Sequence, residues 1–216
     1  MSKQTVLLLH GFLSSASSTK AQYFREKFQA FPQVPFHAFD FNPTPQDFEY
    51  MTITGMIDRL RQYLLDHDLA SEDVRLIGSS MGGLVGLNYA HRFGHVAKLL
   101  LLAPALAYRS HLIDAQARQA WQQAGTWSLF HYGFQKELPL RYGFKVDSQR
   151  YSEPVPPVAP TRIVHGVDDD VVPIKYSRAY VAAHPEQTRL IEVASDHLLH
   201  DQLDLIWKQV NDFLLS

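Results

Sequence analysis

Short apolar runs alternate with segments of helical periodicity along most of the chain, and this alternation limits the fold more than any other feature. Several of the runs are apolar on both faces, which is typical of parallel strands that are covered by helices on both sides. The alternation therefore predicts an α/β fold, a doubly wound, mostly parallel sheet of about six strands. The predicted strands are Val6–Leu9, Phe36–Phe41, Val74–Ile77, Leu99–Leu102, Arg162–Val164 and Arg189–Val193, and the predicted helices between and after them are Ser18–Ala30, Met56–Leu65, Met81–Phe93, Lys175–Ala183 and Gln202–Leu214.

One stretch, from about residue 107 to 158, breaks this alternation. It begins with a helical pattern at Ile113–Trp121, becomes irregular and rich in aromatic residues, and ends in the stiff segment Pro154–Pro160. We interpret it as a small helical or irregular cap inserted between two strands, over a pocket. The 216 residues and 46% hydrophobic content fit a single domain, residues 1–216, because single cores can grow to roughly 250 residues.

Charge and cysteine content exclude several classes of function. The net charge of −2 gives no broad basic field, so nucleic acid is not an expected partner. The chain has no cysteine, which rules out disulfides, thiolate chemistry and cysteine metal sites. The apolar stretch Val6–Leu9 is too short for a signal peptide, and Pro104 interrupts the longest apolar run, Leu99–Tyr108. We therefore expect a cytoplasmic protein without stable membrane insertion; the sequence does not indicate its oligomeric state.

Residues Gly78–Gly82 match the pattern G-x-S-x-G, with Ser80 at its centre. A predicted strand precedes the motif and a helical pattern follows it, as a nucleophile elbow requires. Small residues at Gly78 and Gly82 would permit the sharp turn that exposes such a serine. Ser79 lies one position off the motif, and the alternative is a glycine-rich turn without chemistry. The sequence therefore predicts Ser80 as a nucleophile.

A serine nucleophile needs a base that a third group orients, and in this kind of elbow the chain order is Ser, acid, His. Three adjacent acids, Asp168, Asp169 and Asp170, follow the predicted strand Arg162–Val164 and compete for the role of the acid. For two of them, the alternative role is to form a turn and to cap the helix Lys175–Ala183.

The predicted base is His197, which follows the strand Arg189–Val193 and precedes the last helix. Functional groups in open α/β sheets gather beyond the carboxyl ends of the strands, where Ser80 and the acidic loop also lie. His200 competes with His197 but falls inside or at the cap of the helix, and Asp196 is a possible turn former. The two histidines with nearby aspartates also suggest a metal site, for which the sequence offers no fuller ligand set.

An oxyanion formed at the serine would need two backbone N–H donors. Met81, directly after the nucleophile, supplies one, and Phe12 in the loop after the first strand is the candidate for the other. The side chain of His10 is expected to hold this loop rather than to act as a base.

Four motifs together resemble the α/β-hydrolase superfamily, of the small serine carboxylesterase or acyl thioesterase type. They are His10-Gly11-Phe12, Gly78–Gly83, His165–Pro173 and Ser195-Asp196-His197. The resemblance implies Asp169 as the acid, His197 as the base, and Phe12 and Met81 as oxyanion donors. More narrowly, His10–Ala21 is similar to the entry loop of small intracellular bacterial esterases. Three segments, Gly78–Gly83, Gly125–Ser128 and Arg141–Phe144, are similar to abhydrolase-type palmitoyl-protein thioesterases and acyl-glucuronide esterases.

These features predict a serine hydrolase that cleaves small-molecule acyl esters or thioesters through a Ser80-Asp169-His197 triad and an acyl-enzyme intermediate. No cofactor and no metal is implied. Rival hypotheses are other chemistry on the same fold (a C–C bond hydrolase, a lyase or a cofactor-free peroxidase) and a non-catalytic ligand-binding module. The predicted substrate pocket includes Leu13, Trp127, Phe130 and Tyr132, for which the alternative is packing of the cap onto the sheet; Trp121 is expected in the core.

Overall fold

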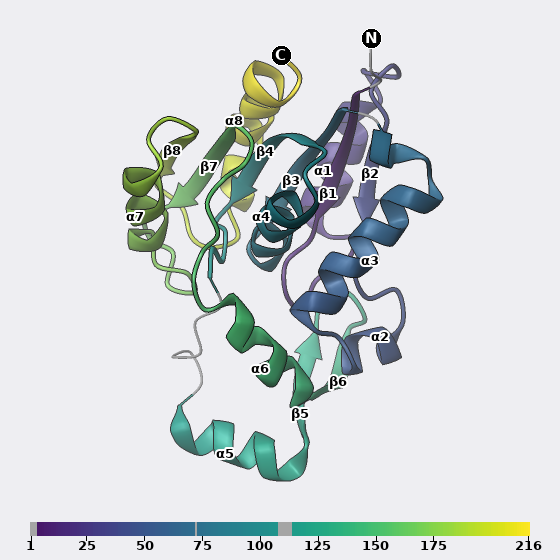
Figure 1. The fold of residues 1–216 in the computed structure, drawn as a ribbon, viewed down its shortest axis with the longest axis vertical. Coiled ribbons are helices and arrows are strands. Elements are labelled where there is room, and N and C mark those ends of the chain that lie inside the picture. The colour runs from purple at the N-terminus through teal and green to yellow at the C-terminus, as the bar shows by residue number, and fades with distance from the viewer. Residues whose placement is uncertain (1–3, 72, 108–113) are drawn as a thin grey trace.

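Six parallel strands form the central sheet of the protein in the computed structural model, which describes residues 4–71, 73–107 and 114–216. The strand order is β2-β1-β3-β4-β7-β8, so the predicted doubly wound parallel sheet is confirmed. All strands run in the same direction, and their carboxyl ends point toward the lower end of the molecule (Figure 1). The strands are β1 (Gln4–Leu9), β2 (Phe36–Phe39), β3 (Asp73–Ser79), β4 (Val96–Leu102), β7 (Thr161–Gly166) and β8 (Thr188–Val193).

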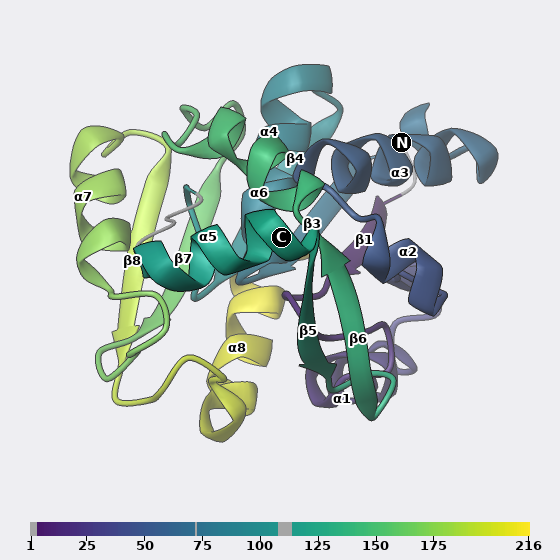
Figure 2. The same cartoon turned by 90° about the horizontal axis from the view of Figure 1, so that it is seen from below.

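Helices cover both faces of this sheet (Figure 2). One face carries α1 (Thr19–Phe28) and α8 (Leu203–Gln209), and the other carries α3 (Ile53–Asp66), α4 (Met81–Phe93) and α7 (Lys175–Ala183). The sheet is buried on both sides because neighbouring strand residues point in opposite directions. In β1, for example, Val6 and Leu8 pack in the core beneath α1, whereas Leu7 and Leu9 pack in the core beneath α3.

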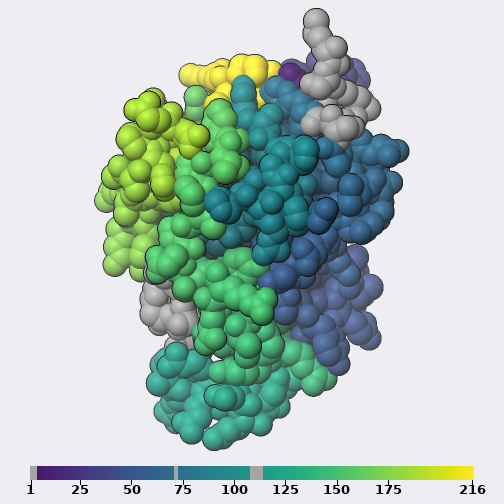
Figure 3. Space-filling model, in the orientation of Figure 1, coloured from purple at the N-terminus to yellow at the C-terminus, as the bar shows by residue number. Residues whose placement is uncertain are grey.

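The segment between β4 and β7 forms a separate layer beyond the carboxyl ends of the strands (Figure 1). It contains α5 (Ala115–Ala124), an antiparallel hairpin of β5 (Thr126–His131) and β6 (Lys136–Arg141), α6 (Gly143–Ser148) and a 3-10 turn, Gln149–Tyr151. The space-filling view shows α5 and α6 gathered at this end of the molecule (Figure 3). We keep the name cap for residues 114–158.

Polar contacts tie the cap to the helices that precede it. The Thr54 hydroxyl of α3 donates to Asp147 Oδ1 of α6 at 2.6 Å, and the Arg141 guanidinium of β6 donates to Glu49 Oε1 at 2.8 Å. Glu49 is the last residue of α2 (Pro45–Glu49). The cap therefore rests on α2 and α3 as well as on the edge of the sheet.

Several local expectations differ from the structure. The part of the cap expected to be irregular contains the β5–β6 hairpin. The strand expected over Phe36–Phe41 ends at Phe39, because the Phe41 N–H donates to the His10 side chain and not to a neighbouring strand. The last helix changes to a π-helical turn at Val210–Leu214, and short 3-10 turns occupy Leu69–Ser71 and His200–Gln202. The expected cap helix is present from Ala115, but its expected start, Ile113, lies outside the described residues. None of the described helices is both long and apolar enough to cross a membrane.

Candidate active site

Ser80 lies at the sharp turn between β3 and α4, in a backbone conformation that L-residues rarely adopt. Its φ is 50° and its ψ is −114°, and its N–H donates to Leu102 O at 2.9 Å. The chain can turn here only because its neighbours are small: a Cβ on Gly78 would lie 2.7 Å from Gly83 Cα, and one on Gly82 would lie 2.1 Å from Leu9 O. Such strain persists only where the surrounding structure fixes it, and it concentrates at functional sites.

The structure brings Ser80 together with His197, which lies on the loop after β8. The Ser80 hydroxyl donates to His197 Nε2 at 3.0 Å, and His197 Nδ1–H donates to Asp169 Oδ2 at 2.7 Å. Only the tautomer with the proton on Nδ1 satisfies both contacts, because a carboxylate can only accept. His197 can therefore take a proton from Ser80 without rearrangement.

Asp169 is held in place by five hydrogen bonds in the loop after β7. Its Oδ1 accepts from the backbone N–H groups of Val171 and Val172 at 2.9 and 2.7 Å, and its Oδ2 accepts from His197 and from His165 Nε2 at 3.1 Å. Its own N–H donates to Gly166 O at 3.4 Å. Burial alone would raise the pKa of this carboxyl, but the hydrogen bonds from His165, His197 and Val172 outweigh it and hold the pKa well below the usual range. Asp169 is therefore an anion at neutral pH.

The neighbouring acids do not compete for this position. Asp168 and Asp170 are exposed, whereas Asp169 is buried, so the structure selects the middle one of the three aspartates. The alternative role of capping α7 is not filled by either of them, because the N-cap of α7 is Ile174 and no side chain caps this helix.

His165 forms a second layer behind Asp169, which sequence reasoning did not identify. The imidazole is fully buried; its Nε2–H also donates to Val172 O at 2.8 Å, and the hydroxyl of buried Ser177 donates to its Nδ1 at 2.8 Å. Since Nε2 faces two acceptors, the proton must lie on that nitrogen. His165 thus links α7 to the carboxylate.

The remaining histidine and acid near the site have different positions. His200 begins a 3-10 turn and forms no hydrogen bond with Ser80. The Asp196 carboxylate accepts from the N–H groups of Leu198 and Leu199 at 2.8 and 3.2 Å, the turn-forming role expected for it. This turn holds the loop from which His197 reaches Ser80.

The two predicted oxyanion donors lie in segments adjacent to Ser80. Met81 begins α4, and the loop after β1 passes so close that a Cβ on Gly11 would lie 3.4 Å from Ser80 Cβ. Within the described residues, the backbone N–H groups of Phe12 and Met81 donate no hydrogen bond. Two such donors beside a nucleophile are the requirement of an oxyanion hole.

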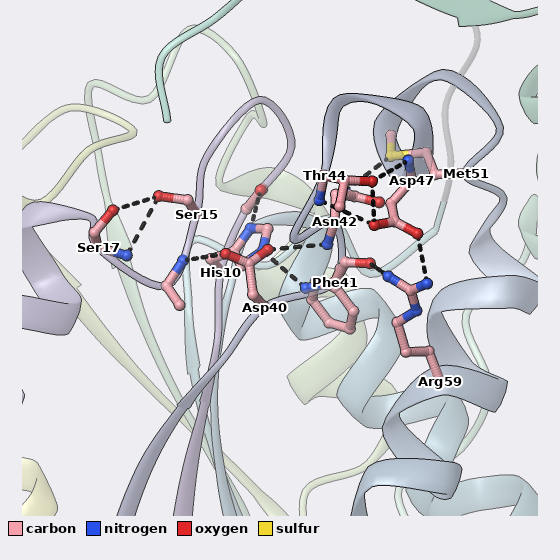
Figure 4. A network of polar contacts seen from close by, with 12 residues as sticks. His10, Ser15, Ser17, Asp40, Phe41, Asn42, Thr44, Asp47, Met51 and Arg59 are labelled. Carbon is pink, nitrogen blue, oxygen red and sulfur yellow. Dashed lines mark hydrogen bonds and ion pairs between the residues drawn. The ribbon is translucent and has the colours of Figure 1, made fainter. Parts of the chain in front are cut away.

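A polar network holds the Phe12 loop against the end of β2 (Figure 4). His10 Nδ1 lies 2.8 Å from Gly11 O, and its Nε2 lies 3.1 Å from the Phe41 backbone nitrogen and 3.2 Å from Asp40 Oδ1. The other Asp40 oxygen accepts from Ala16 N–H at 3.1 Å. Burial opposes ionisation of Asp40, but the contacts with His10 and the backbone prevail and lower its pKa to about 2. His10 is therefore a loop-holding residue, as expected.

Two cavities meet at Ser80 and Phe12, which line both. The first, about 410 Å³, lies beneath the cap and is mainly apolar. Its walls include Leu106, Trp121, Trp127, Leu140, Phe144 and Tyr180. The second, about 600 Å³, opens on the other side, between the Phe12 loop and His197. We call them the cap cavity and the loop cavity.

The four predicted pocket residues do not line a single pocket in the structure. Trp127 lines the cap cavity, and Leu13 and Tyr132 line the loop cavity. Phe130 lines neither; its side chain is 41% exposed and packs against the Tyr132 ring. The reason is strand alternation, because positions 127 and 130 of β5 point to opposite faces of the hairpin. Trp121 is buried, as expected, and donates its indole N–H to Leu140 O at 2.9 Å.

Comparison with protein families and curated proteins gives a consistent set of relatives. The model of the family described as "Uncharacterised protein family (UPF0227)" matches residues 5–214. Mouse "Palmitoyl-protein thioesterase ABHD10, mitochondrial" is 25% identical over 148 residues, which cover 64% of this chain and 50% of that protein. The chain thus spans about half the length of the curated relatives it matches.

Solved structures show the same fold. Mouse alpha/beta hydrolase domain-containing protein 10 superimposes with a TM-score of 0.77 at 22% identity, covering 98% of this chain and 90% of that one. The esterase EaEST from Exiguobacterium antarcticum gives a TM-score of 0.72 at 18% identity, covering 100% and 93%. The α/β-hydrolase fold that the sequence motifs predicted is therefore confirmed.

Proposed function

This chain belongs to the Uncharacterised protein family (UPF0227), and from that premise we propose that it is a serine hydrolase of carboxylic esters or thioesters. The observation that carries the proposal is the continuous hydrogen-bonded chain from the Ser80 hydroxyl through His197 to the Asp169 carboxylate. A serine is a weak nucleophile unless an oriented base removes its proton, and this arrangement supplies that base. The esterase and thioesterase names among the structural and curated relatives support the same class of reaction.

The proposed reaction is a two-step acyl transfer. His197 takes the proton of Ser80 as its oxygen attacks the acyl carbon, and the N–H groups of Phe12 and Met81 stabilise the negative charge on the carbonyl oxygen. His197 then gives the proton to the departing alcohol or thiol. Water, activated by the same histidine, releases the acid from Ser80. Asp169 keeps the proton of His197 on Nδ1 and stabilises the imidazolium form.

We assign the acyl group to the cap cavity. Its walls are mainly apolar and aromatic, and Ser80 lines it. Burial of a hydrocarbon chain is favourable by about 0.8 kcal/mol per CH₂ group, so a cavity of this kind discriminates between chain lengths. The depth of the cavity should therefore set the longest acyl chain that is cleaved efficiently.

A panel of p-nitrophenyl esters and of matching thioesters, with acyl chains of increasing length, tests the proposal. We expect kcat/KM to rise with chain length to an optimum and then to fall, and the Ser80→Ala variant to lose the activity. Binding of the esters without turnover would instead support a non-catalytic binding module, and turnover that survives in Ser80→Ala would contradict the proposed nucleophile.

A matched pair of variants on α7 tests the acyl assignment. Ala179 lines the cap cavity, whereas Ala182 on the same helix does not, and both residues are exposed. Ala179→Trp should shift the optimum to shorter chains by narrowing the cavity, and Ala182→Trp should leave the chain-length profile unchanged. A profile that is the same in all three proteins would place the acyl chain elsewhere.

A further inference from the structure

The loop cavity lies on the side of Ser80 where a leaving group would depart. His197 lines the loop cavity but not the cap cavity, and Ser80 lines both. In acyl transfer the base that deprotonates the serine later protonates the leaving alcohol or thiol, so that group must lie on the His197 side. With the acyl chain in the cap cavity, the leaving group therefore occupies the loop cavity.

The walls of the loop cavity have the chemistry of an anion site. Hydroxyl groups come from the loop that leads into α1, Lys20 supplies an ammonium group, and the imidazoles of His10, His197 and His200 complete the polar part of the wall. No Asp or Glu is among the described residues that line it. The cavity also contains the N-terminus of α1, a ten-residue helix, where the helix dipole favours negative charge. Its hydroxyl-bearing walls are Ser14, Ser15, Ser17, Ser18, Thr19, Ser79, Ser80 and Tyr132.

Lys20 is the unusual member of this set. It is only 8% exposed, and within the described part of the chain its ammonium group forms no hydrogen bond and no ion pair. Lysine is almost never this deeply buried without a partner, because desolvation of the charge is costly. Burial lowers the pKa of Lys20 to about 8, against the opposing attraction of the Asp196 carboxylate. The group is thus still mainly protonated at pH 7.

Position on α1 explains how the lysine is buried. Lys20, Phe24 and Phe28 are spaced four residues apart, so they form one stripe on the inner face of the helix. Phe24 and Phe28 pack into the core beneath α1, and Lys20 at the end of the stripe reaches the cavity. A lysine that served only solubility would lie on the outer face, as Lys27 of the same helix does with its side chain 39% exposed.

We infer that Lys20 recognises a negatively charged oxygen group, a carboxylate or a phosphate, on the alcohol or thiol part of the substrate. The inference rests on the proposed ester or thioester hydrolysis and adds to it the class of leaving group. Such a group would pair with the buried ammonium and accept hydrogen bonds from the surrounding hydroxyls. Lys20 is in this account a specificity-determining residue, and it takes no part in the proton transfers at Ser80.

Three butyryl esters that differ only in the terminal group of the leaving alcohol, neutral in one and anionic in two, test the inference at pH 7. Their alcohols are 4-hydroxyphenylacetamide, 4-hydroxyphenylacetate and 4-hydroxybenzylphosphonate, in which a CH₂ group insulates the ester from the charge. We expect wild-type kcat/KM to be at least tenfold higher for one of the two anionic esters than for the neutral amide. The preferred anion distinguishes a carboxylate-bearing from a phosphate-bearing leaving group.

Substitutions on α1 assign this preference to one residue. Lys20→Met should reduce the ratio of anionic to neutral kcat/KM to less than twofold, and Lys20→Arg should retain part of the preference. Lys27→Met, the same change outside both cavities, should leave the ratio unchanged. Because methionine removes a desolvated charge, Lys20→Met should fold with an unchanged or higher Tm. Absence of a preference in the wild type, or its persistence in Lys20→Met, would overturn the inference.

Binding separates this inference from the proposed function. In the inactive Ser80→Ala background, calorimetry with free 4-hydroxyphenylacetate and 4-hydroxybenzylphosphonate should show binding that Lys20→Met weakens at least tenfold. Lys20-dependent binding without hydrolysis of any ester would refute the esterase proposal and leave the anion site. Hydrolysis of all three esters at equal rates, with no Lys20-dependent binding, would refute the anion site and leave the esterase.

Discussion

His197 Nε2 lies 3.0 Å from Ser80 Oγ, although 117 residues separate the two along the chain. Ser80 follows β3 and His197 follows β8, and two further strands lie between these in the sheet. The contact forms because parallel strands end at one edge, where their loops converge. Asp169, on the loop after β7, completes the arrangement and orients the histidine.

Removal of the charge of Asp169 should disable the site without disturbing the fold. Asp169→Asn would leave His197 in the wrong tautomer, and in a triad of this type the expected loss of kcat is about 10⁴-fold. Asp168→Asn and Asp170→Asn are matched controls because both residues are exposed, and they should retain kcat within about threefold. An equal loss in all three variants, measured by steady-state kinetics, would show that Asp169 has no special role.

His165 is expected to act as a positioning residue. It shares Asp169 Oδ2 with His197, so His165→Asn should leave the carboxylate less fixed, with His197 as the remaining donor to Oδ2. We expect a loss of kcat of about tenfold with little change in KM, and an acid limb of the kcat/KM profile that moves to higher pH. A variant that loses stability but keeps the wild-type pH profile would indicate a purely structural role.

The Asp40 network should stabilise the protein in a pH-dependent manner. The pKa of Asp40 falls from 3.8 to about 2 on folding, so its stabilising contribution is present above pH 4 and is lost as the pH falls toward 2. The shift corresponds to about 2 kcal/mol at neutral pH. Urea titrations give the free energy of unfolding of the wild type and of Asp40→Asn. The difference between the two should therefore shrink as the pH falls from 5 to 2.5. Asp58→Asn, at an exposed site, is the control, and a difference that is constant with pH would contradict the account.

Gly82 should tolerate no side chain. A Cβ there would lie 2.1 Å from the backbone oxygen of Leu9, so Gly82→Ala must displace β1 or the elbow itself. Overpacking typically lowers the free energy of unfolding by about 1–3 kcal/mol, and for Gly82→Ala we expect a decrease at or above the upper end of this range. Gly143→Ala meets nothing within 4 Å and should change the free energy of unfolding by less than about 1 kcal/mol. Equal stability of the two variants in denaturant titrations would show that the turn can relax.

The sheet could be predicted because strands buried on both faces leave continuous apolar runs such as Val6–Leu9. The β5–β6 hairpin could not be predicted, because its residues alternate between the cap interior and solvent and aromatic side chains occur on both of these faces. Helix α2 is too short for a periodic pattern, although Thr44 and Asp47 form a capping box that the sequence does contain.

The site was predictable where residues lie in local motifs and not where partners come from afar. Ser80 and His197 follow strands in recognisable patterns, whereas the link between His10 and Asp40 spans 30 residues and exists only in the folded chain. Lys20 did have a signal, its spacing of four residues from Phe24 and eight from Phe28 on an otherwise apolar stripe. Which cap aromatics line a cavity depends on the hairpin, so the sequence could not show that Trp127 lines the cap cavity and Phe130 does not.

Covalent labelling of Ser80 tests the central claim most directly. The protein is treated with a fluorophosphonate, and the intact mass and the modified peptide are measured by mass spectrometry. We predict addition of one probe at Ser80 in the wild type and in Ser79→Ala, and none in Ser80→Ala or in unfolded protein. An unlabelled wild type with a folded structure, or labelling that persists in Ser80→Ala, would contradict the assignment of Ser80 as the nucleophile.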